Sequence, residues 1–111
     1  MSRAAETSTS LLRGRILRDV WQERERQEEL CRQGKFTHTA ASPDLPNGYR
    51  LTALVEEVGE AAEAVLERDG YIGKPKGTDL RKELVQVAAV AVAWIEALDR
   101  TADPTPKAST S

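Results

Sequence analysis

The chain has 111 residues, of which 31% are charged and 40% hydrophobic, and its formal net charge at pH 7 is −2. This length indicates a single domain, and the hydrophobic content is too high for wholesale disorder. The slightly acidic balance gives no indication of a protein that binds nucleic acid or attaches to an anionic membrane.

The single cysteine, Cys31, excludes an intrachain disulfide. The N-terminus shows no apolar block of signal-peptide length. The longest run without a charge, Leu84 to Ile95, is too short for a membrane span, which needs about 20 residues. We therefore expect a soluble, cytoplasmic protein with no membrane partner.

Residues 1–9 are rich in Ser, Thr and Ala, and they are predicted to form a flexible tail. A first helix is expected from Ser10, a suitable cap, to about Gln33, with Gly34 at the usual stop position. Its apolar residues lie on one stripe, and Trp21 is assigned to the core. The stripe contains Leu12, Ile16, Leu17, Val20 and Trp21, and it resumes at Leu30 and Cys31.

The middle of this helix, Gln22 to Glu29, contains no apolar residue. Arg24 and Gln27 nevertheless lie on the continuation of the stripe, where packing residues are normally found. One interpretation is that the helix leaves the bundle here and is solvated. The other is that a polar patch faces a functional site.

Lys35 to Asn47 has no clear periodicity and is predicted to be a loop, long enough to suggest a function. Its His38 is the only histidine and has no second ligand nearby, which is more typical of a surface residue than of a catalyst. Asn47 is a suitable cap for a second helix that ends near Arg68, with Asp69-Gly70 as its stop.

Apolar and acidic residues alternate at helical spacing along the second helix, LTALVEEVGEAAEAVLE. Glu56, Glu60, Glu63 and Glu67 form one acidic stripe, and Glu57 lies one position round from it. Like charges at these spacings destabilise a helix by a few tenths of a kcal/mol per pair. The stripe is therefore either a solvated face or a site that takes its cation from elsewhere.

The next connection, Gly70 to Thr78, contains three glycines and a proline, which exclude regular structure. It carries Lys74 and Lys76, but it lacks the spacing of a P-loop. The segment is either a flexible basic turn or a contact for phosphate oxygens.

A third helix is expected from a cap at Thr78 or Asp79 to about Asp99, followed by a disordered tail from Thr101. Leu84 to Ile95 is apolar nearly all round, so this part must be buried on more than one side. We therefore predict an all-α protein in which three helices form an antiparallel bundle that dimerisation completes.

Two short polar motifs can meet between the second and third helices. Glu57 and Glu60 are three residues apart, as are Glu83 and Gln86, so each pair shares a helix face. Three carboxylates and an amide oxygen make an all-oxygen site, which suits Mg²⁺ or Mn²⁺. A divalent cation would relieve the repulsion among the carboxylates.

The region from about Tyr49 to Leu98 resembles the all-α nucleoside triphosphate pyrophosphohydrolases, in particular the MazG-like and phage-type members of the dUTPase/MazG superfamily. The family signature is E-x-x-E followed by E-x-x-D, and this chain has Glu57-Val-Gly-Glu60 and then Glu83-Leu-Val-Gln86. The resemblance implies a MazG-like helical domain over residues 10–100. With the apolar third helix, we expect a homodimer or tetramer. The resemblance also implies cleavage of a (deoxy)nucleoside triphosphate to the monophosphate and pyrophosphate.

The chemistry of the site suggests roles for individual residues. Glu57, Glu60 and Glu83 would hold Mg²⁺, with Gln86 either as a neutral ligand or as a residue that orients the ligands. Glu56 would accept the proton of the attacking water. The remaining candidates contact substrate: Lys74 and Lys76 at the leaving pyrophosphate, and Arg24 on the first helix. Trp21 is a further candidate for this contact, although a core position suits it better.

Gln86 departs from the family pattern, because it keeps a carbonyl oxygen but lacks the charge of the aspartate. We expect weaker metal binding or one ion in place of two, and an inactive regulatory relative is also consistent with it. A helical dimer that binds a protein partner, or a protein that only senses nucleotides, remains an alternative to the enzyme.

Overall fold

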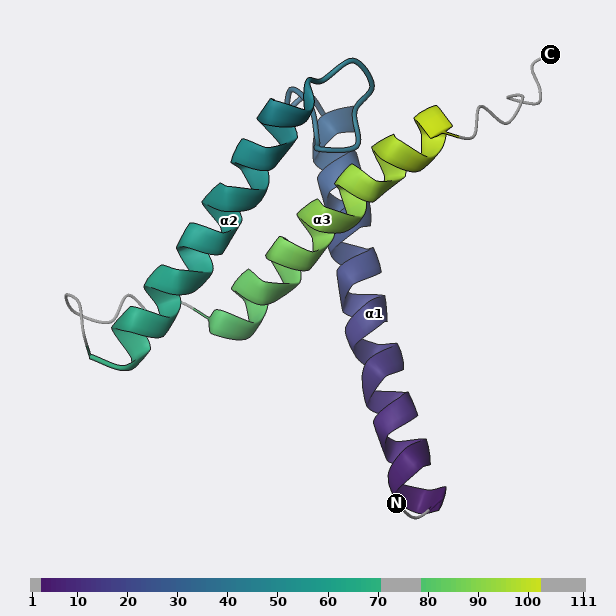
Figure 1. Cartoon of the computed structure of the whole chain (residues 1–111), viewed down its shortest axis with the longest axis vertical. Coiled ribbons are helices and arrows are strands. Elements are labelled where there is room, and N and C mark those ends of the chain that lie inside the picture. Colours follow the sequence, from purple (N-terminus) through teal and green to yellow (C-terminus); the bar gives the residue numbers. More distant parts are fainter. Residues whose placement is uncertain (1–2, 71–78, 103–111) are drawn as a thin grey trace.

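The computed structural model describes residues 3–70 and 79–102, and these residues form three α-helices and no strand. The helices are α1 (Arg3–Arg32), α2 (Asn47–Arg68) and α3 (Leu80–Ala102). α3 packs against both of the others, running antiparallel to α2 and crossing α1 (Figure 1). The N-terminal half of α1 extends well beyond this crossing (Figure 1). The all-α class is therefore confirmed for the described part of the chain.

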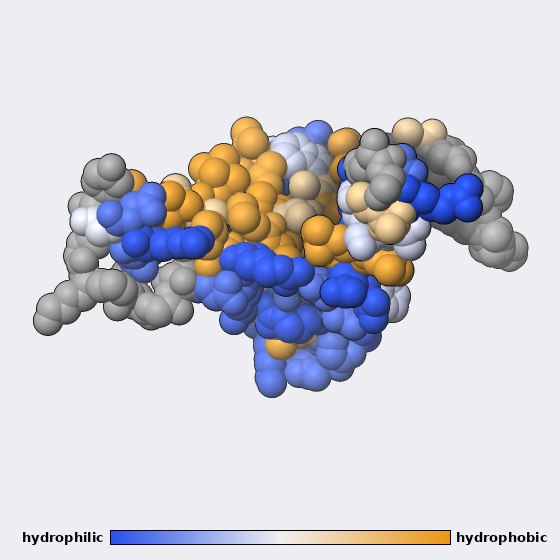
Figure 2. Space-filling model, turned by 90° about the horizontal axis from the view of Figure 1, so that it is seen from below, coloured by the Kyte–Doolittle hydropathy of each residue, from blue (hydrophilic) through white to orange (hydrophobic). Residues whose placement is uncertain are grey.

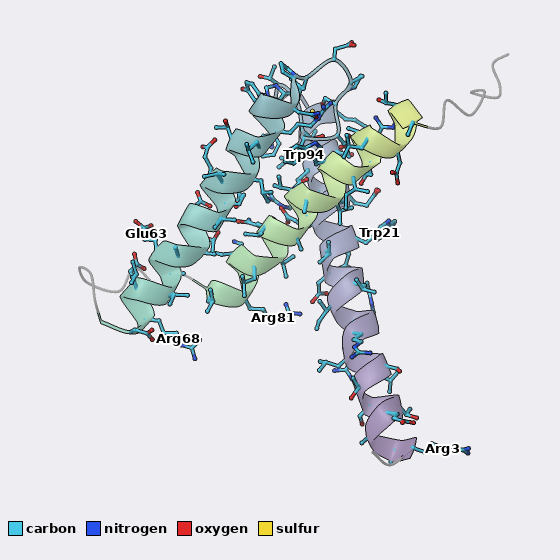
Figure 3. The ribbon with its side chains drawn as sticks, viewed as in Figure 1. Arg3, Trp21, Glu63, Arg68, Arg81 and Trp94 are labelled. Atoms are coloured by element: carbon cyan, nitrogen blue, oxygen red, sulfur yellow. The ribbon has the colours of Figure 1, made fainter. Side chains whose placement is uncertain are left out.

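α1 is longer than the sequence predicts, because it begins at Arg3 rather than Ser10. Residues 3–9, which were expected in the flexible tail, are helical, and the Thr9 hydroxyl donates to the Ala5 carbonyl at 2.9 Å. The assignment of Trp21 to the core is wrong for this chain, since its side chain is 63% exposed and points outward from α1 (Figure 3).

The polar middle of α1 packs against α3. Arg24 and Gln27 are buried, so the solvated interpretation is wrong for these two residues. The guanidinium of Arg24 donates to both carboxylate oxygens of Glu96, at 2.8 and 2.9 Å, and to Glu28 at 2.7 Å. A bidentate, charge-assisted pair therefore connects α1 to α3 at their crossing.

Small residues are buried on α2 and α3, which pack against each other. Ala61 and Ala64 are buried on α2, and Ala89 and Ala93 are fully buried on α3. Side chains of this size let two helix axes approach closely. Because they place the polar residues of neighbouring turns near the facing helix, they also position the candidate site.

The start of α2 differs from the prediction in its cap. α2 begins at Asn47, directly after Pro46, and no side chain caps it. The Asn47 amide oxygen instead accepts hydrogen bonds from Arg50 and Trp94, both at 3.0 Å. Asp79 caps α3 as predicted, by accepting the backbone N–H of Lys82 at 3.3 Å.

The segment between α1 and α2 is tied to all three helices. Arg50 of α2 donates to the carbonyls of Ala40 and Ser42, both at 2.8 Å, and Arg100 of α3 donates to that of Ala41 at 2.9 Å. The Thr39 hydroxyl donates to Glu28 of α1 at 2.9 Å. These contacts fix residues 39–42 as a wall against the helices.

Much of the apolar surface of the described residues stays exposed. No large side chain among them is fully buried, and hydrophobic residues gather in a broad area on the face shown in Figure 2. α3 contributes Leu84, Ile95 and Leu98, each about half exposed. Within the described residues, no helix has an apolar stretch long enough to cross a membrane.

Candidate functional site

Three glutamates meet between α2 and the first turn of α3. Glu57 and Glu60 lie one helical turn apart on α2, and Glu83 lies near the start of α3. Each offers a carboxylate oxygen, and these three oxygens all lie within 4.8 Å of one another. We call this cluster the glutamate triad. It brings together the three carboxylates whose spacing predicted a site.

The triad is electrostatically unfavourable when all three groups are ionised. Burial, followed by the negative charge of Glu60, raises the pKa of Glu57 to about 7, and Glu83 and Glu23 contribute in the same direction. Burial and the charge of Glu60 also raise the pKa of Glu83. Such shifts are typical of carboxylates that share a site without a neutralising cation.

Two carboxylate oxygens of the triad have no hydrogen-bond partner in the described part of the chain. Glu57 Oε2 and Glu83 Oε2 are buried, and no donor among the described residues reaches them. A buried acceptor without a donor is costly, so these atoms require a partner of some kind. Because the nearby groups are carboxylate oxygens, the arrangement fits a hard divalent cation such as Mg²⁺ or Mn²⁺.

An open pocket of about 200 Å³ adjoins the triad and shares Glu57 with it. Its walls come from all three helices and from the segment between α1 and α2. Rings line one side, where His38 and Tyr49 meet edge to face with their centroids 4.8 Å apart. The pocket therefore combines aromatic surface with a carboxylate that belongs to the triad.

The other predicted site residues lie in different places. Gln86 lines the pocket beside Glu57. Glu56 is exposed on α2 and belongs to neither the triad nor the pocket lining, so its role as a base stays a prediction. Arg24 forms ion pairs with Glu96 and Glu28, on the side of α1 that packs against α3. Lys74 and Lys76 lie outside the described residues.

Sequence reasoning missed most of the pocket. α1 contributes Glu23, Arg26 and Gln27, and the carboxylate of Glu23 pairs with Arg26 at 2.8 Å. His38, which was interpreted as a surface residue, is only partly exposed and lines the pocket. The sequence did contain one signal, since Arg24 and Gln27 continue the apolar stripe of the first helix. This pattern indicated a polar site but did not identify the residues that form it.

Comparisons with protein-family models, with curated proteins and with solved structures find no match to this chain. The resemblance to the pyrophosphohydrolases therefore stays a prediction. It depends on the two acidic motifs and their order along the chain.

Proposed function

We propose that the chain is a metal-dependent pyrophosphohydrolase that cleaves (deoxy)nucleoside triphosphates to the monophosphate and pyrophosphate. The observation that carries this proposal is the glutamate triad, in which two buried carboxylate oxygens have no partner among the described residues. The adjoining pocket supports it, because a nucleotide must place its base near the cation that binds its phosphates.

The residues of the triad have separable roles in this proposal. Glu57, Glu60 and Glu83 would hold the ion, and Gln86 would offer a neutral oxygen from the next turn of α3. A bound Mg²⁺ would neutralise phosphate charge and activate a water molecule for attack on phosphorus. Glu57 and Glu83 must lose their protons before they can serve as ligands, so their raised pKa values couple ion binding to pH.

The pocket has the composition of a binding site for a flat ring. Phe36, His38 and Tyr49 provide aromatic surface, and Ala53 and Val90 provide aliphatic contacts. We assign this pocket to the nucleobase, with the sugar and phosphates extending past Glu57 to the triad. Lys74 and Lys76 remain candidates for contact with the leaving pyrophosphate.

We further propose that the working unit is a homodimer or a tetramer. The exposed apolar residues include Leu17 and Trp21 of α1 and Ile95 of α3. A second copy that covers these side chains would supply the larger core that one chain lacks.

The test is pyrophosphate release from a panel of dNTPs and NTPs with Mg²⁺, with Mn²⁺ and with chelator. We expect release that requires metal and falls by at least about 100-fold in Glu57→Ala, because the ion loses a ligand. Glu63→Ala is the matched control, since Glu63 lies on the same helix and projects away from α3 (Figure 3). It should keep the wild-type rate.

If no nucleotide gives pyrophosphate release, the next variant to assay is Gln86→Asp, which supplies a fourth carboxylate. If this variant is also inactive, the catalytic proposal is wrong. Nucleotide binding without product would then identify a sensor, and the absence of binding would favour a helical interaction protein.

A further inference from the structure

The orientation of one amide in the pocket follows from its neighbour. Arg24 Nη1 donates to the Gln27 side-chain oxygen at 3.0 Å. A guanidinium can only donate, so the atom that faces it must be the amide oxygen and not the NH₂ group. The NH₂ group is left at the other end of a side chain that lines the pocket.

Arg24 is itself held in place by α3. Its guanidinium is buried and makes the bidentate pair with Glu96, together with the bond to Glu28. Turning the Gln27 amide over would place its NH₂ against Nη1, and two donors would then face each other in a buried position. That arrangement forfeits the hydrogen bond and leaves a buried donor unsatisfied, so the orientation is well determined.

The neighbouring polar groups on this wall are already engaged. The guanidinium of Arg26 donates twice to Glu23, at 2.8 and 2.9 Å. The Thr39 hydroxyl donates to Glu28 and accepts the backbone N–H of Ala41. Gln27 is therefore the group on this wall that offers the pocket a neutral donor of fixed direction.

We propose that Gln27 determines base specificity and that Arg24 is its positioning residue. This inference rests on the assignment of the pocket to the nucleobase. A fixed N–H donor favours bases with a carbonyl oxygen at the edge where cytosine and adenine carry an amino group. The preferred substrates are therefore the triphosphates of uracil, thymine, guanine or hypoxanthine.

The decisive experiment compares dUTP with dCTP, which have the same charge and differ at the C4 carbonyl or amino group. The ratio of their kcat/KM values in the wild type should be roughly tenfold or more in favour of dUTP, expressed mainly in KM. Gln27→Glu replaces the donor by an acceptor while still accepting from Arg24, so it should invert the ratio. Gln27→Met removes both groups and should bring the ratio close to one.

Gln22→Glu is the matched control, because it adds the same charge to an exposed position of α1 and should leave the ratio unchanged. Arg24→Lys keeps a positive charge opposite Glu96 but removes the fork that fixes the amide. It should lower the ratio with little change in kcat, and an unchanged ratio would overturn the positioning role.

The outcomes separate this inference from the proposed function. Equal hydrolysis of dUTP and dCTP, or a preference that Gln27→Glu does not alter, overturns the role of Gln27 and leaves the hydrolase intact. If no triphosphate is hydrolysed, the proposed function fails, and calorimetric binding of dUMP and dCMP decides the role of Gln27. Tighter binding of dUMP that reverses in Gln27→Glu supports it, whereas equal binding or no binding overturns it.

Discussion

Glu57 is the residue on which the triad and the pocket both depend. Its carboxylate is partly buried, and one of its oxygens has no partner within residues 3–70 and 79–102. Burial and the charge of Glu60 raise its pKa to about 7. Folding therefore favours the protonated form of this group. In the absence of metal, the contribution of Glu57 to the free energy of unfolding should be largest below the ordinary carboxyl pKa and should be lost as the pH rises through 7.

Glu57→Gln removes this dependence. At pH 8 without metal, it should raise the free energy of unfolding by roughly 1 kcal/mol, because an ionised and crowded carboxylate is replaced by a neutral amide and solvent screens part of the repulsion at this partly exposed group. At pH 5 the variant and the wild type should differ little. Thermal melting in chelator over pH 5–8 measures both values, with Glu63→Gln as the control. A wild-type stability that increases between pH 5 and 8, and that the substitution does not change, would contradict this account.

Some residues of the candidate site could be placed from the sequence, and others could not. Glu57, Glu60 and Glu83 could be predicted because a three-residue spacing on two neighbouring helices fixes which faces meet. The role proposed for Gln27 could not be predicted, because it depends on a hydrogen bond from Arg24. The orientation of the Arg24 guanidinium is in turn fixed by Glu96 on another helix. No local pattern encodes a contact between residues 72 positions apart.

At the scale of elements, the segment between α1 and α2 acts as a wall of the pocket. Arg50 is buried and connects this wall to α2 through the carbonyls of Ala40 and Ser42. The sequence indicated a loop long enough to suggest a function, but the hydrogen bonds from Arg50 to this loop were not predictable. An arginine near the start of an amphipathic helix is usually solvated, and only the folded chain places backbone carbonyls within its reach.

Arg50→Lys should loosen this wall. A lysine ammonium cannot reach both carbonyls and Asn47 at once, so partly buried acceptors lose their donor at a cost of roughly 1 kcal/mol. The melting temperature should fall, and KM should rise more than kcat changes, because the wall contributes to the pocket and not to the triad. Arg32→Lys is the control, since Arg32 is exposed and pairs with Glu29 alone among the described residues. A rise in KM of the same size in the control would contradict the role of Arg50.

At the scale of the whole molecule, the helix pattern was largely predictable, but the packing of one chain was not. Periodicity located all three helices, and Gly34, Asp79 and Gly70 marked boundaries correctly. The assignment of Trp21 to the core failed because periodicity identifies an apolar face without identifying what covers it. The same limit applies to α3, whose apolar residues are only partly covered within this chain.

A second copy of the chain should cover part of this surface. Sedimentation at micromolar concentration should give at least twice the mass of one chain for the wild type. Leu17→Glu with Trp21→Glu should shift the protein towards the monomer, because burying two carboxylates in an apolar interface is strongly unfavourable. A wild type that stays monomeric at all concentrations would rule out the dimer.

The most direct test of the central claim is to follow the hydrolysis of a nucleoside triphosphate by ³¹P NMR with Mg²⁺ and then with chelator. We predict signals of the monophosphate and of pyrophosphate in equal amounts, their loss in chelator, and their absence in Glu57→Ala. Formation of a diphosphate and inorganic phosphate, or turnover that persists without metal, would contradict the claim that the glutamate triad makes this chain a pyrophosphohydrolase.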